Sequence, residues 1–397
     1  MALPDLDRLL GPPPGLRGQR VFLRADLNVP LEAGAVADDT RIRAALPSLR
    51  RLLAAGARVV MASHLGRPGG RRRPELSLRP VAARLAELLG RPVGFCEDVV
   101  GPGAEAASRA LHDGEVLLLE NLRFEAGETQ NDPALARSLA SLADVYVNDA
   151  FGTAHRAHAS TVGMVPLVPR RAAGDLLLGE LSHLQAVRDP KRPLLCLLGG
   201  AKVSDKLSVL EALAPHADVL AVGGAMAYTF LLAEGLPTGS SLVEAERAPD
   251  ARRVLTAARD AGRRLLLPQD HRVAERLEPD APCQVVERIP DGWMGVDIGP
   301  VTAQAYADEA RQAATIFWNG PMGVFEIDAF ATGTETVAVG VADSSGLSIV
   351  GGGDSLAALN RLGLGDRIGH LSTGGGAALE YVQGRTLPAL AALEENS

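Results

Sequence analysis

Short apolar runs alternate with longer amphipathic segments along the chain. In the first half, the runs predict strands at Arg20–Leu27, Arg58–Ala62, Pro92–Cys96, Val116–Leu119 and Val145–Asn148. Apolar positions spaced three and four residues apart predict helices between them, near 40–55, 78–89, 103–111 and 133–142. Strands that alternate with helices of this length are typical of βαβ units, which build a parallel sheet.

The second half repeats this alternation. Its predicted strands are Leu194–Leu198, Val219–Val222, Arg264–Leu267, Thr315–Trp318, Ser348–Val350 and Ile368–Leu371. Between the halves, Val165–Arg171 holds two prolines and a basic pair, which indicates a domain boundary. A single amphipathic helix, Asp175–Val187, is then expected to connect two α/β domains.

Composition narrows the class of protein. The 397 residues suit two domains, and 47% apolar with 22% charged residues is typical of a globular chain. No apolar run approaches the ~20 residues of a membrane span, and the N-terminus lacks a secretory signal. Three scattered cysteines, Cys96, Cys196 and Cys283, have no metal-binding spacing, so we expect a cytoplasmic protein.

Charge is unevenly distributed. The first 171 residues carry 22 arginines against 19 acidic residues, within a chain of net charge −8. This excess suits a small anionic ligand, and it is too weak for nucleic acid, since aromatic residues make up only 4% of the chain.

Polar residues directly follow four predicted strands of the first half. They are 26–28, 63–67, 120–123 and 148–156, and Arg41 begins the helix after the first of them. Because ligands bind beyond the carboxyl ends of parallel strands, we expect these side chains to line one crevice. Arginines and histidines gathered there would bind a small phosphorylated carboxylic acid. The alternative for any single arginine is a surface salt bridge.

Glycine-rich loops follow five predicted strands of the second half, at 199–202, 223–226, 320–323, 351–355 and 372–376. Glycine lets a backbone approach a ligand closely, and N–H groups at helix starts bind phosphate oxygens. Ordinary turns would explain one or two such loops, but five indicate a nucleotide. Asp354 could meet a phosphate-bound Mg²⁺, and Glu326 a ribose hydroxyl. The chain has neither a Walker loop nor a dinucleotide fingerprint.

The first of these loops also holds two of the three lysines in the chain, Lys202 and Lys206. Arginine serves almost everywhere else, which indicates that a compact, mobile ammonium is needed here. The spacing of Val203, Leu207 and Leu210 predicts a helix that begins directly after Gly199–Gly200. The alternative is a pair of solvated helix charges.

Nine motifs make the chain resemble the phosphoglycerate kinase family over essentially its whole length. They are RADLNVP at 24–30, SHLGRP at 63–68, LLENLRF at 118–124, NDAFGTAHRAHAS at 148–160, LLGGAKVSDK at 197–206, WMGVDIGP at 293–300, WNGPMGVFE at 318–326, GGGDS at 351–355 and STGGGAALE at 372–380. The resemblance implies two Rossmann-like, doubly wound parallel-sheet domains with a cleft between them. It also implies reversible phosphoryl transfer from 1,3-bisphosphoglycerate to MgADP, giving 3-phosphoglycerate and MgATP.

The resemblance also implies the organisation of the chain. We expect a phosphoglycerate-binding domain over 1–171, an interdomain helix in 172–190 and a nucleotide-binding domain over 191–385. The tail 386–397 is expected to pack back on the first domain. The family is usually monomeric, and nucleic-acid or membrane partners are not expected.

Site residues carried over from the family fall into three sets. The substrate-binding set is Asp26, Asn28, Arg41, His64, Arg67, Arg123 and Arg156. The nucleotide-binding set is Lys202, Lys206, Gly295, Glu326, Gly351, Gly352, Gly353, Asp354 and Ser355, with Asp354 also the metal ligand. The catalytic set is Arg41, Lys206, Gly375 and Gly376.

This chemistry needs no general base, because the attacking carboxylate or diphosphate oxygen is already an anion at neutral pH. Catalysis then rests on positioning and charge stabilisation. We expect Arg41 and Lys206 to act on the transferring phosphoryl group, and the remaining arginines with His64 to hold the distal phosphate. Hinge closure about the connecting helix would bring the ligands together and expel water.

Two other classes stay open on the sequence. Another carboxylate kinase or a nucleotide-dependent ligase would differ in its acceptor acid. A dinucleotide-binding oxidoreductase would need a glycine fingerprint after the first strand, which this chain lacks. A non-catalytic binding role fits less well, since both half-sites look intact.

Overall fold

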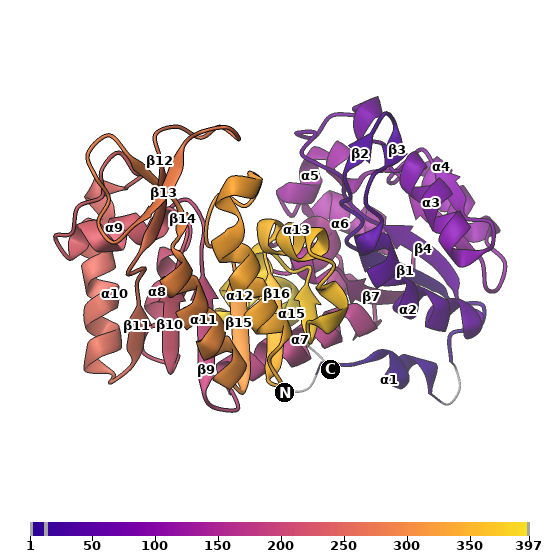
Figure 1. Cartoon of the computed structure of the whole chain (residues 1–397). Helices are drawn as coiled ribbons and strands as arrows, with labels where there is room; N and C mark the ends of the chain where they lie inside the picture. Colours follow the sequence, from indigo (N-terminus) through magenta and orange to yellow (C-terminus); the bar gives the residue numbers. More distant parts are fainter. Residues whose placement is uncertain (1–2, 12–14, 395–397) are drawn as a thin grey trace. The chain divides into compact units, whose positions relative to one another are not determined.

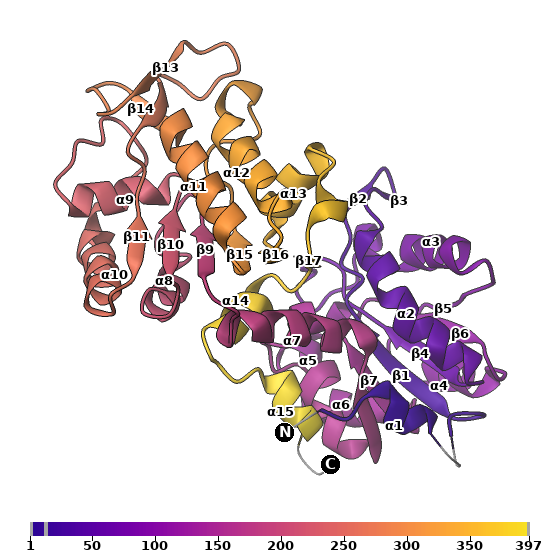
Figure 2. The same cartoon turned by 60° about the horizontal axis from the view of Figure 1, so that its bottom comes forward.

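The computed structural model describes residues 3–11 and 15–394. The chain forms two compact units, which we call unit 1 and unit 2. Unit 1 runs to Leu181 and takes up the chain again from Thr386, and unit 2 is Ser182–Arg385. Figures 1 and 2 show a central sheet with flanking helices in each unit. The predicted α/β class with two parallel sheets is confirmed.

Unit 1 is built on a six-stranded parallel sheet. Its strand order is β5-β6-β4-β1-β7-β8. The strands are β1 (Arg20–Ala25), β4 (Arg58–Ala62), β5 (Gly94–Cys96), β6 (Val116–Leu119), β7 (Val145–Asp149) and β8 (Arg170–Ala173). A short antiparallel hairpin, β2 (Leu31–Glu32) and β3 (Ala35–Val36), precedes the second helix.

Helices of unit 1 surround this sheet. They are α1 (Leu6–Leu10), α2 (Thr40–Ala54), α3 (Arg79–Leu89), α4 (Pro102–Ala110), α5 (Ala126–Thr129), α6 (Pro133–Ala140) and α15 (Pro388–Glu394). Alternate residues of β1, such as Val21 and Leu23, join one core cluster with Leu49 of α2 and Leu85 of α3. Because side chains of a strand alternate between faces, Phe22 and Arg24 point to the opposite face.

Strand β8 corrects the boundary expected at 165–171. That segment does not link domains, because β8 pairs in parallel with β7, with Val145 opposite Arg170. Its prolines precede an edge strand, a position that sheets tolerate. The division between the units falls further along, inside α7 (Asp175–Arg188), after Leu181. Asp149 at the end of β7 accepts a hydrogen bond from the Leu176 N–H at 2.9 Å and so caps the start of α7.

The chain returns to unit 1 at its C-terminal end. The Ala389 N–H of α15 donates to the Ala154 carbonyl at 3.1 Å, in the loop after β7. Leu393 of α15 is fully buried. The expected tail covers 386–397, and its last three residues lie outside the described part of the chain.

Unit 2 holds a second six-stranded parallel sheet, with the order β11-β10-β9-β15-β16-β17. Its strands are β9 (Leu194–Leu198), β10 (Val219–Val222), β11 (Arg264–Leu266), β15 (Thr315–Asn319), β16 (Leu347–Gly351) and β17 (His370–Ser372). The helices are α8 (Leu207–Leu213), α9 (Met226–Ala233), α10 (Ala248–Asp260), α11 (Pro300–Gln312), α12 (Thr332–Ala342), α13 (Gly353–Arg361) and α14 (Gly376–Val382).

Close helix packing covers one face of this sheet. Tyr306 of α11 and Val337 of α12 share a core cluster with Leu197 of β9 and Trp318 of β15. At Gly340 of α12, an added Cβ would lie 2.6 Å from the Ala307 Cβ, so glycine lets α11 and α12 approach.

A three-stranded antiparallel sheet was not predicted. It pairs β13 (Cys283–Val286) with β12 (His271–Ala274) and β12 with β14 (Met294–Ile298). Strand β13 is largely exposed and lacks the apolar alternation that marks a strand. No helix in the described part of the chain combines the length and the apolar character needed to cross a membrane.

Candidate functional site

The substrate residues predicted in unit 1 follow the carboxyl ends of the neighbouring strands β6, β4, β1 and β7. The best-defined pair is Asp26, directly after β1, and Arg41 in the first turn of α2. The Asp26 Oδ2 accepts from the Arg41 Nη1 at 2.5 Å. Although burial opposes it, the Arg41 and Arg24 guanidiniums and a hydrogen bond from the Asn28 N–H hold the Asp26 pKa below its usual value. Asp26 is therefore an anion that orients Arg41.

Two asparagines fix the loops that carry the other groups. The Asn28 Oδ1 accepts the Gly66 N–H at 2.8 Å, so the loop after β1 holds the loop after β4. The Asn121 Oδ1 accepts the Leu65 N–H at 3.1 Å, and the Asn121 Nδ2 donates to the Leu65 carbonyl at 2.7 Å. These bonds satisfy buried backbone groups and set the positions of His64 and Arg67.

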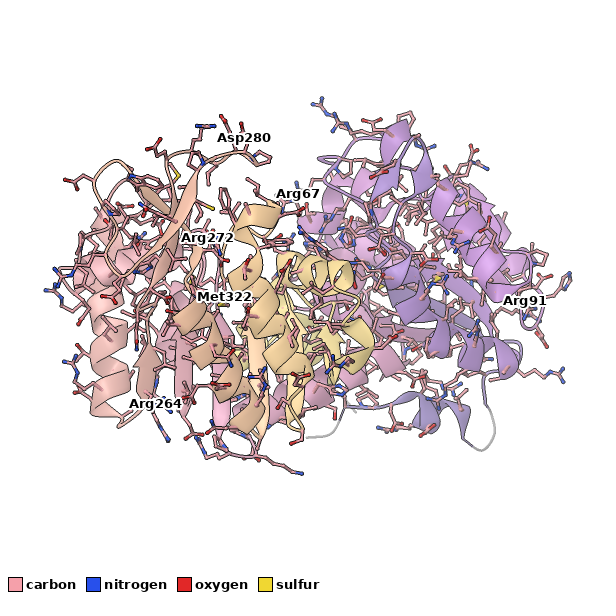
Figure 3. All side chains as sticks on the ribbon, in the orientation of Figure 1. Arg67, Arg91, Arg264, Arg272, Asp280 and Met322 are labelled. Atoms are coloured by element: carbon pink, nitrogen blue, oxygen red, sulfur yellow. The ribbon has the colours of Figure 1, made fainter. Side chains whose placement is uncertain are left out.

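The three arginines expected at the distal phosphate differ in environment. Arg123 is nearly buried, and its Nη1 donates to the Gly66 carbonyl at 2.6 Å. Its buried Nε has no hydrogen-bond partner among the described residues. Burial, with repulsion from Arg24 and Arg156, lowers the Arg123 pKa to about 10. Arg67 and Arg156 are exposed on their loops. Figure 3 labels Arg67 among the side chains.

His64 lies inside this cluster rather than at its rim. Its Nδ1 is 3.3 Å from the Arg24 Nη2 and 4.0 Å from the Asp26 Oδ1. Burial lowers the His64 pKa well below its usual value, and the neighbouring arginines lower it further. The imidazole is therefore neutral at neutral pH.

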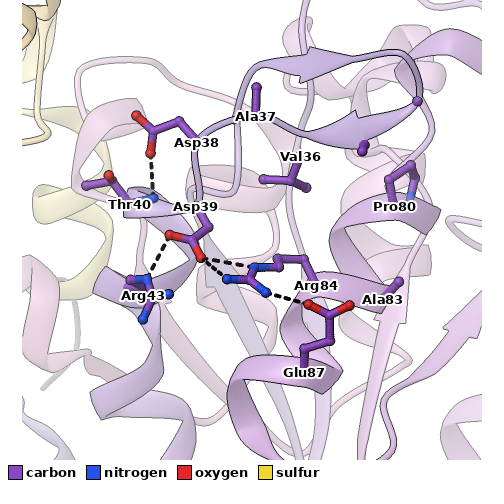
Figure 4. Close-up of a pocket in the computed structure, with 12 residues that line it drawn as sticks. Val36, Ala37, Asp38, Asp39, Thr40, Arg43, Pro80, Ala83, Arg84 and Glu87 are labelled. Carbon is purple, nitrogen blue, oxygen red and sulfur yellow. Dashed lines mark hydrogen bonds and ion pairs between the residues drawn. The ribbon is translucent and has the colours of Figure 1, made fainter.

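A separate surface cavity of about 780 Å³ lies between α3 and the loop that leads into α2 (Figure 4). Its lining contains none of the predicted site residues. Its charged groups pair with one another: Arg84 binds Asp39 at 2.7 Å, and Asp39 also binds Arg43. These bonds tie the first turn of α2, which carries Arg41, to α3.

Two glycine-rich loops of unit 2 contact each other through backbone atoms, without intervening side chains. An added Cβ at Gly199 would lie 2.0 Å from the Pro321 carbonyl oxygen. At Gly320, where φ is +97°, it would lie 2.2 Å from the Gly199 carbonyl oxygen. The loops after β9 and β15 can therefore meet only because both are glycine.

Lys206 sits where these two loops meet. Its Nζ donates to the Asn319 carbonyl at 3.0 Å and also contacts the Asn319 side-chain oxygen. Burial lowers the Lys206 pKa to about 8, although the nearby Asp354 and Asp205 carboxylates favour the charged form. A partly desolvated ammonium beside glycine backbone is suited to a phosphate group.

The structure separates the two lysines of this loop and corrects its local fold. Lys202 is exposed, and its charge acts on Glu244, whose carboxylate also accepts from the Ser204 N–H at 2.9 Å. The helix expected directly after Gly200 begins only at Leu207, with Lys206 as its N-cap. Because Val203 is buried in a turn rather than on a helix, its apolar spacing was misleading.

The loop after β16 leads directly into α13. Gly352 is the N-cap of α13 with φ +94°, a conformation that favours glycine. The Ser355 Oγ accepts the Gly320 N–H at 2.7 Å, which joins this loop to the loop after β15. Asp354 is exposed in the first turn of α13.

The other predicted nucleotide residues are more dispersed. Gly295 lies in β14, where its N–H donates to the Ser241 Oγ at 2.9 Å and an added Cβ would strike the Tyr228 ring. Glu326 is exposed in the turn after Phe325. Gly375, with φ +51°, is the N-cap of the short helix α14, and Gly376 is its first residue.

Several residues that shape the site were missed in the sequence. Arg24, Asn121 and Asn319 lie within the family motifs without an expected role, and they contact His64, Leu65 and Lys206, respectively. Asp297, buried in β14, accepts from the Gly333 N–H at 2.6 Å and so holds the start of α12, and burial raises its pKa to about 7. For Arg24, Asp297 and Asn319, a polar residue within a strand was the available signal, whereas Asn121 lies beyond the end of β6.

Residues 14–385 match the family model described as Phosphoglycerate kinase. The chain belongs to the phosphoglycerate kinase family. The phosphoglycerate kinase of Moorella thermoacetica is 56% identical over 96% of this chain and 97% of its own length. That of Rubrobacter xylanophilus is 57% identical over 96% of each chain.

Solved structures agree with this assignment. The phosphoglycerate kinase of Coxiella burnetii has a TM-score of 0.89 and 41% identity, covering 99% of both chains. That of Pyrococcus horikoshii has a TM-score of 0.83 and 34% identity over 96% of both chains. Reversible phosphoryl transfer in glycolysis is the known function of the phosphoglycerate kinase family.

Proposed function

We propose that this chain catalyses reversible phosphoryl transfer between 1,3-bisphosphoglycerate and MgADP, giving 3-phosphoglycerate and MgATP. The observation that carries the proposal is Arg123. A buried guanidinium nitrogen without a partner, in a cluster of positive charge that lowers its own pKa, calls for an anion. A phosphorylated acid supplies that anion, and family membership supports this choice of acid.

The proposed roles follow from these environments. Arg41, oriented by Asp26, acts on the transferring phosphoryl group and the glycerate carboxyl end. Arg67, Arg123 and Arg156, with Asn28 and His64, bind the rest of the acid. In unit 2, Lys206 follows the phosphoryl charge. The loop 351–355, with Lys202, Gly295 and Glu326, holds the nucleotide. The loop that contains Gly375 and Gly376 faces the transferring phosphoryl group.

The residues present fit a magnesium ion held mainly by the nucleotide. Mg²⁺ usually takes one or two carboxylates together with substrate phosphates and water. Asp354 supplies one such carboxylate, and no cluster of three or more His, Cys, Asp or Glu residues in the described chain suits a metal held by protein alone. When bound, the ion would offset the charge of the nucleotide phosphates.

Catalysis is proposed to proceed by positioning and charge stabilisation without a general base. The attacking oxygen is an anion at neutral pH, since a carboxyl group has a pKa near ~4. His64 is neutral and buried, which suits a ligand contact better than proton transfer. Because the two ligands are assigned to different units, the reaction also requires hinge closure about α7.

We further propose a monomeric, cytoplasmic enzyme. Cys96, Cys196 and Cys283 are all free thiols, which suits a reducing compartment.

A coupled assay tests the proposal. The purified chain is mixed with 3-phosphoglycerate, ATP and Mg²⁺, and the acyl phosphate is followed with its dehydrogenase and NADH. Turnover that EDTA abolishes is the expected result. Turnover with a different carboxylic acid in place of 3-phosphoglycerate would favour another carboxylate kinase. NADH binding without the coupling enzyme would favour an oxidoreductase.

A further inference from the structure

A buried array of polar groups lies behind the substrate residues of unit 1. Glu128 of α5 is fully buried, and its carboxylate accepts both the Ser160 Oγ–H at 2.6 Å and the Ser160 N–H at 3.0 Å. The same Ser160 Oγ accepts from the Arg24 Nε at 2.9 Å. The serine hydroxyl therefore links a buried carboxylate to a buried guanidinium.

Strand alternation brings Arg24 into this array. Arg24 lies in β1 and points away from the face that Val21 and Leu23 bury. It is fully buried, and its Nη1 contacts the Ala25 carbonyl. A buried charge is costly unless it is paired and hydrogen-bonded. Glu128, reached through Ser160, provides the opposite charge.

Ser160 belongs to a single π-helical turn, η4 (Ala159–Gly163). The Tyr146 hydroxyl of β7 donates to the Ser160 carbonyl at 2.9 Å, and Phe22 stacks on the Tyr146 ring. Tyr146 thus binds the Ser160 carbonyl, while Glu128 binds the Ser160 N–H. Because Ser160 is held in place, its hydroxyl fixes the position of the Arg24 Nε.

Arg24 in turn contacts His64. The Arg24 Nη2 lies 3.3 Å from the His64 Nδ1, closer than the Asp26 Oδ1 at 4.0 Å. A guanidinium can only donate hydrogen bonds. The Nδ1 must therefore accept, and the imidazole proton must lie on Nε2. A proton on Nδ1 would place two N–H donors against each other.

We propose that Arg24, held by Ser160 and Glu128, is a positioning residue that keeps His64 neutral with its proton on Nε2. His64 then offers one directed N–H donor to an oxyanion of the phosphorylated acid and adds no further positive charge. The identity of the ligand that His64 binds rests on the proposed function. The protonation state and tautomer of the His64 imidazole do not depend on that function.

The groups that face His64 set its pH behaviour. Arg24 from β1, Arg41 from α2 and Arg123 from the loop after β6 disfavour its protonation, and Asp26 favours it. Burial acts with the arginines, so we expect His64 to stay neutral at the pH where an ordinary histidine titrates.

Nitrogen-15 NMR of the full chain with labelled histidine tests the proposal without substrate. His64 signals are assigned by their loss in His64→Gln. The expected spectrum is a neutral imidazole with Nε2 protonated and Nδ1 unprotonated throughout pH 5.5–8. A proton on Nδ1, or titration within that range, would overturn the proposal even if the enzyme turns over 3-phosphoglycerate.

Ser160→Ala cuts the link between Glu128 and Arg24. We expect mixed His64 tautomers or titration into the measured range, with KM for 3-phosphoglycerate raised about ten-fold and KM for ATP unchanged. Ser108→Ala is the matched control, because Ser108 is also fully buried but its hydroxyl donates to the Glu105 carbonyl within its own helix, α4. If both variants leave the His64 spectrum and KM as in the parent chain, the array has no positioning role.

Glu128→Gln covers the case in which Ser160→Ala does not fold. The amide oxygen can accept from only one of the two Ser160 donors, so the counter-charge and one hydrogen bond to Ser160 are lost. The same shift in the His64 spectrum is expected, and an unchanged spectrum would contradict the role of Glu128. Absence of 3-phosphoglycerate turnover alongside the expected tautomer would refute the proposed function alone.

Discussion

Lys206 lies in an environment that disfavours its own charged form. Burial lowers its pKa from 10.5 to about 8, so the folded protein binds its proton less tightly than the unfolded chain. The stability penalty is therefore complete below pH 8 and disappears as pH rises from 8 to 10.5.

Lys206→Met is predicted to raise the free energy of unfolding of the ligand-free protein by about 1–3 kcal/mol at pH 7. The gain should shrink toward pH 10.5, while kcat falls on the order of 10²-fold or more. Urea unfolding at several pH values and the coupled assay measure both effects. Lys191→Met is the control, because Lys191 is exposed and its backbone carbonyl, which the substitution keeps, accepts from the Thr315 hydroxyl. A variant that loses both stability and activity would show that Lys206 is structural.

Lys206→Arg tests whether lysine itself is required. A rigid guanidinium cannot follow a moving phosphoryl charge as an ammonium can. We therefore expect most of the activity to be lost with nucleotide binding retained, as judged by calorimetry with MgADP. Full activity in this variant would mean that the scarcity of lysine in the chain carried no information.

The loops that follow β9 and β15 contact each other through the backbones of Gly199 and Gly320. Gly320→Ala should cost more than ~3 kcal/mol of unfolding free energy, because its Cβ would lie 2.2 Å from the Gly199 carbonyl oxygen at φ +97°. Gly262→Ala is the control, with φ +67° and nothing within 4 Å, and about 1 kcal/mol is expected there. Chemical denaturation of both variants provides the comparison. Equal losses would mean that the left-handed backbone, not the close approach, requires glycine at Gly320.

The sequence predicted the elements whose patterns are strong and local. Strands β4, β6, β9 and β10 begin and end where their apolar runs do, because both faces of these strands are buried. It failed where tertiary context decides. Strand β13 is exposed, the turn at 201–206 mimics helical spacing, and β8 follows two prolines.

The site residues were predictable in identity but not in environment. Arg41, Lys206 and Asp354 follow from their places at strand ends or helix starts. The burial of His64, the partner-free nitrogen of Arg123 and the link from Arg24 to Glu128 depend on side chains far apart in sequence. No local pattern reports such distances.

At the scale of the whole molecule, the proposed reaction requires ligands assigned to two units to meet. We predict that the radius of gyration in solution falls when 3-phosphoglycerate and MgADP bind together, and less with either alone. Small-angle scattering of the four states measures this. An unchanged radius with both ligands at saturation would contradict closure and leave the ligand assignments standing.

The role of Arg41 is the central claim, and one comparison tests it most directly. Arg41→Ala and Arg43→Ala remove the same side chain from the same turn of α2, but only Arg41 contacts the buried Asp26. In the coupled assay with 3-phosphoglycerate, ATP and Mg²⁺, we predict that kcat falls on the order of 10²–10³-fold in Arg41→Ala and stays near the parent value in Arg43→Ala. MgADP affinity should be unchanged in both. Equal kcat in the two variants, or a matching loss of MgADP affinity in Arg41→Ala, would contradict the account.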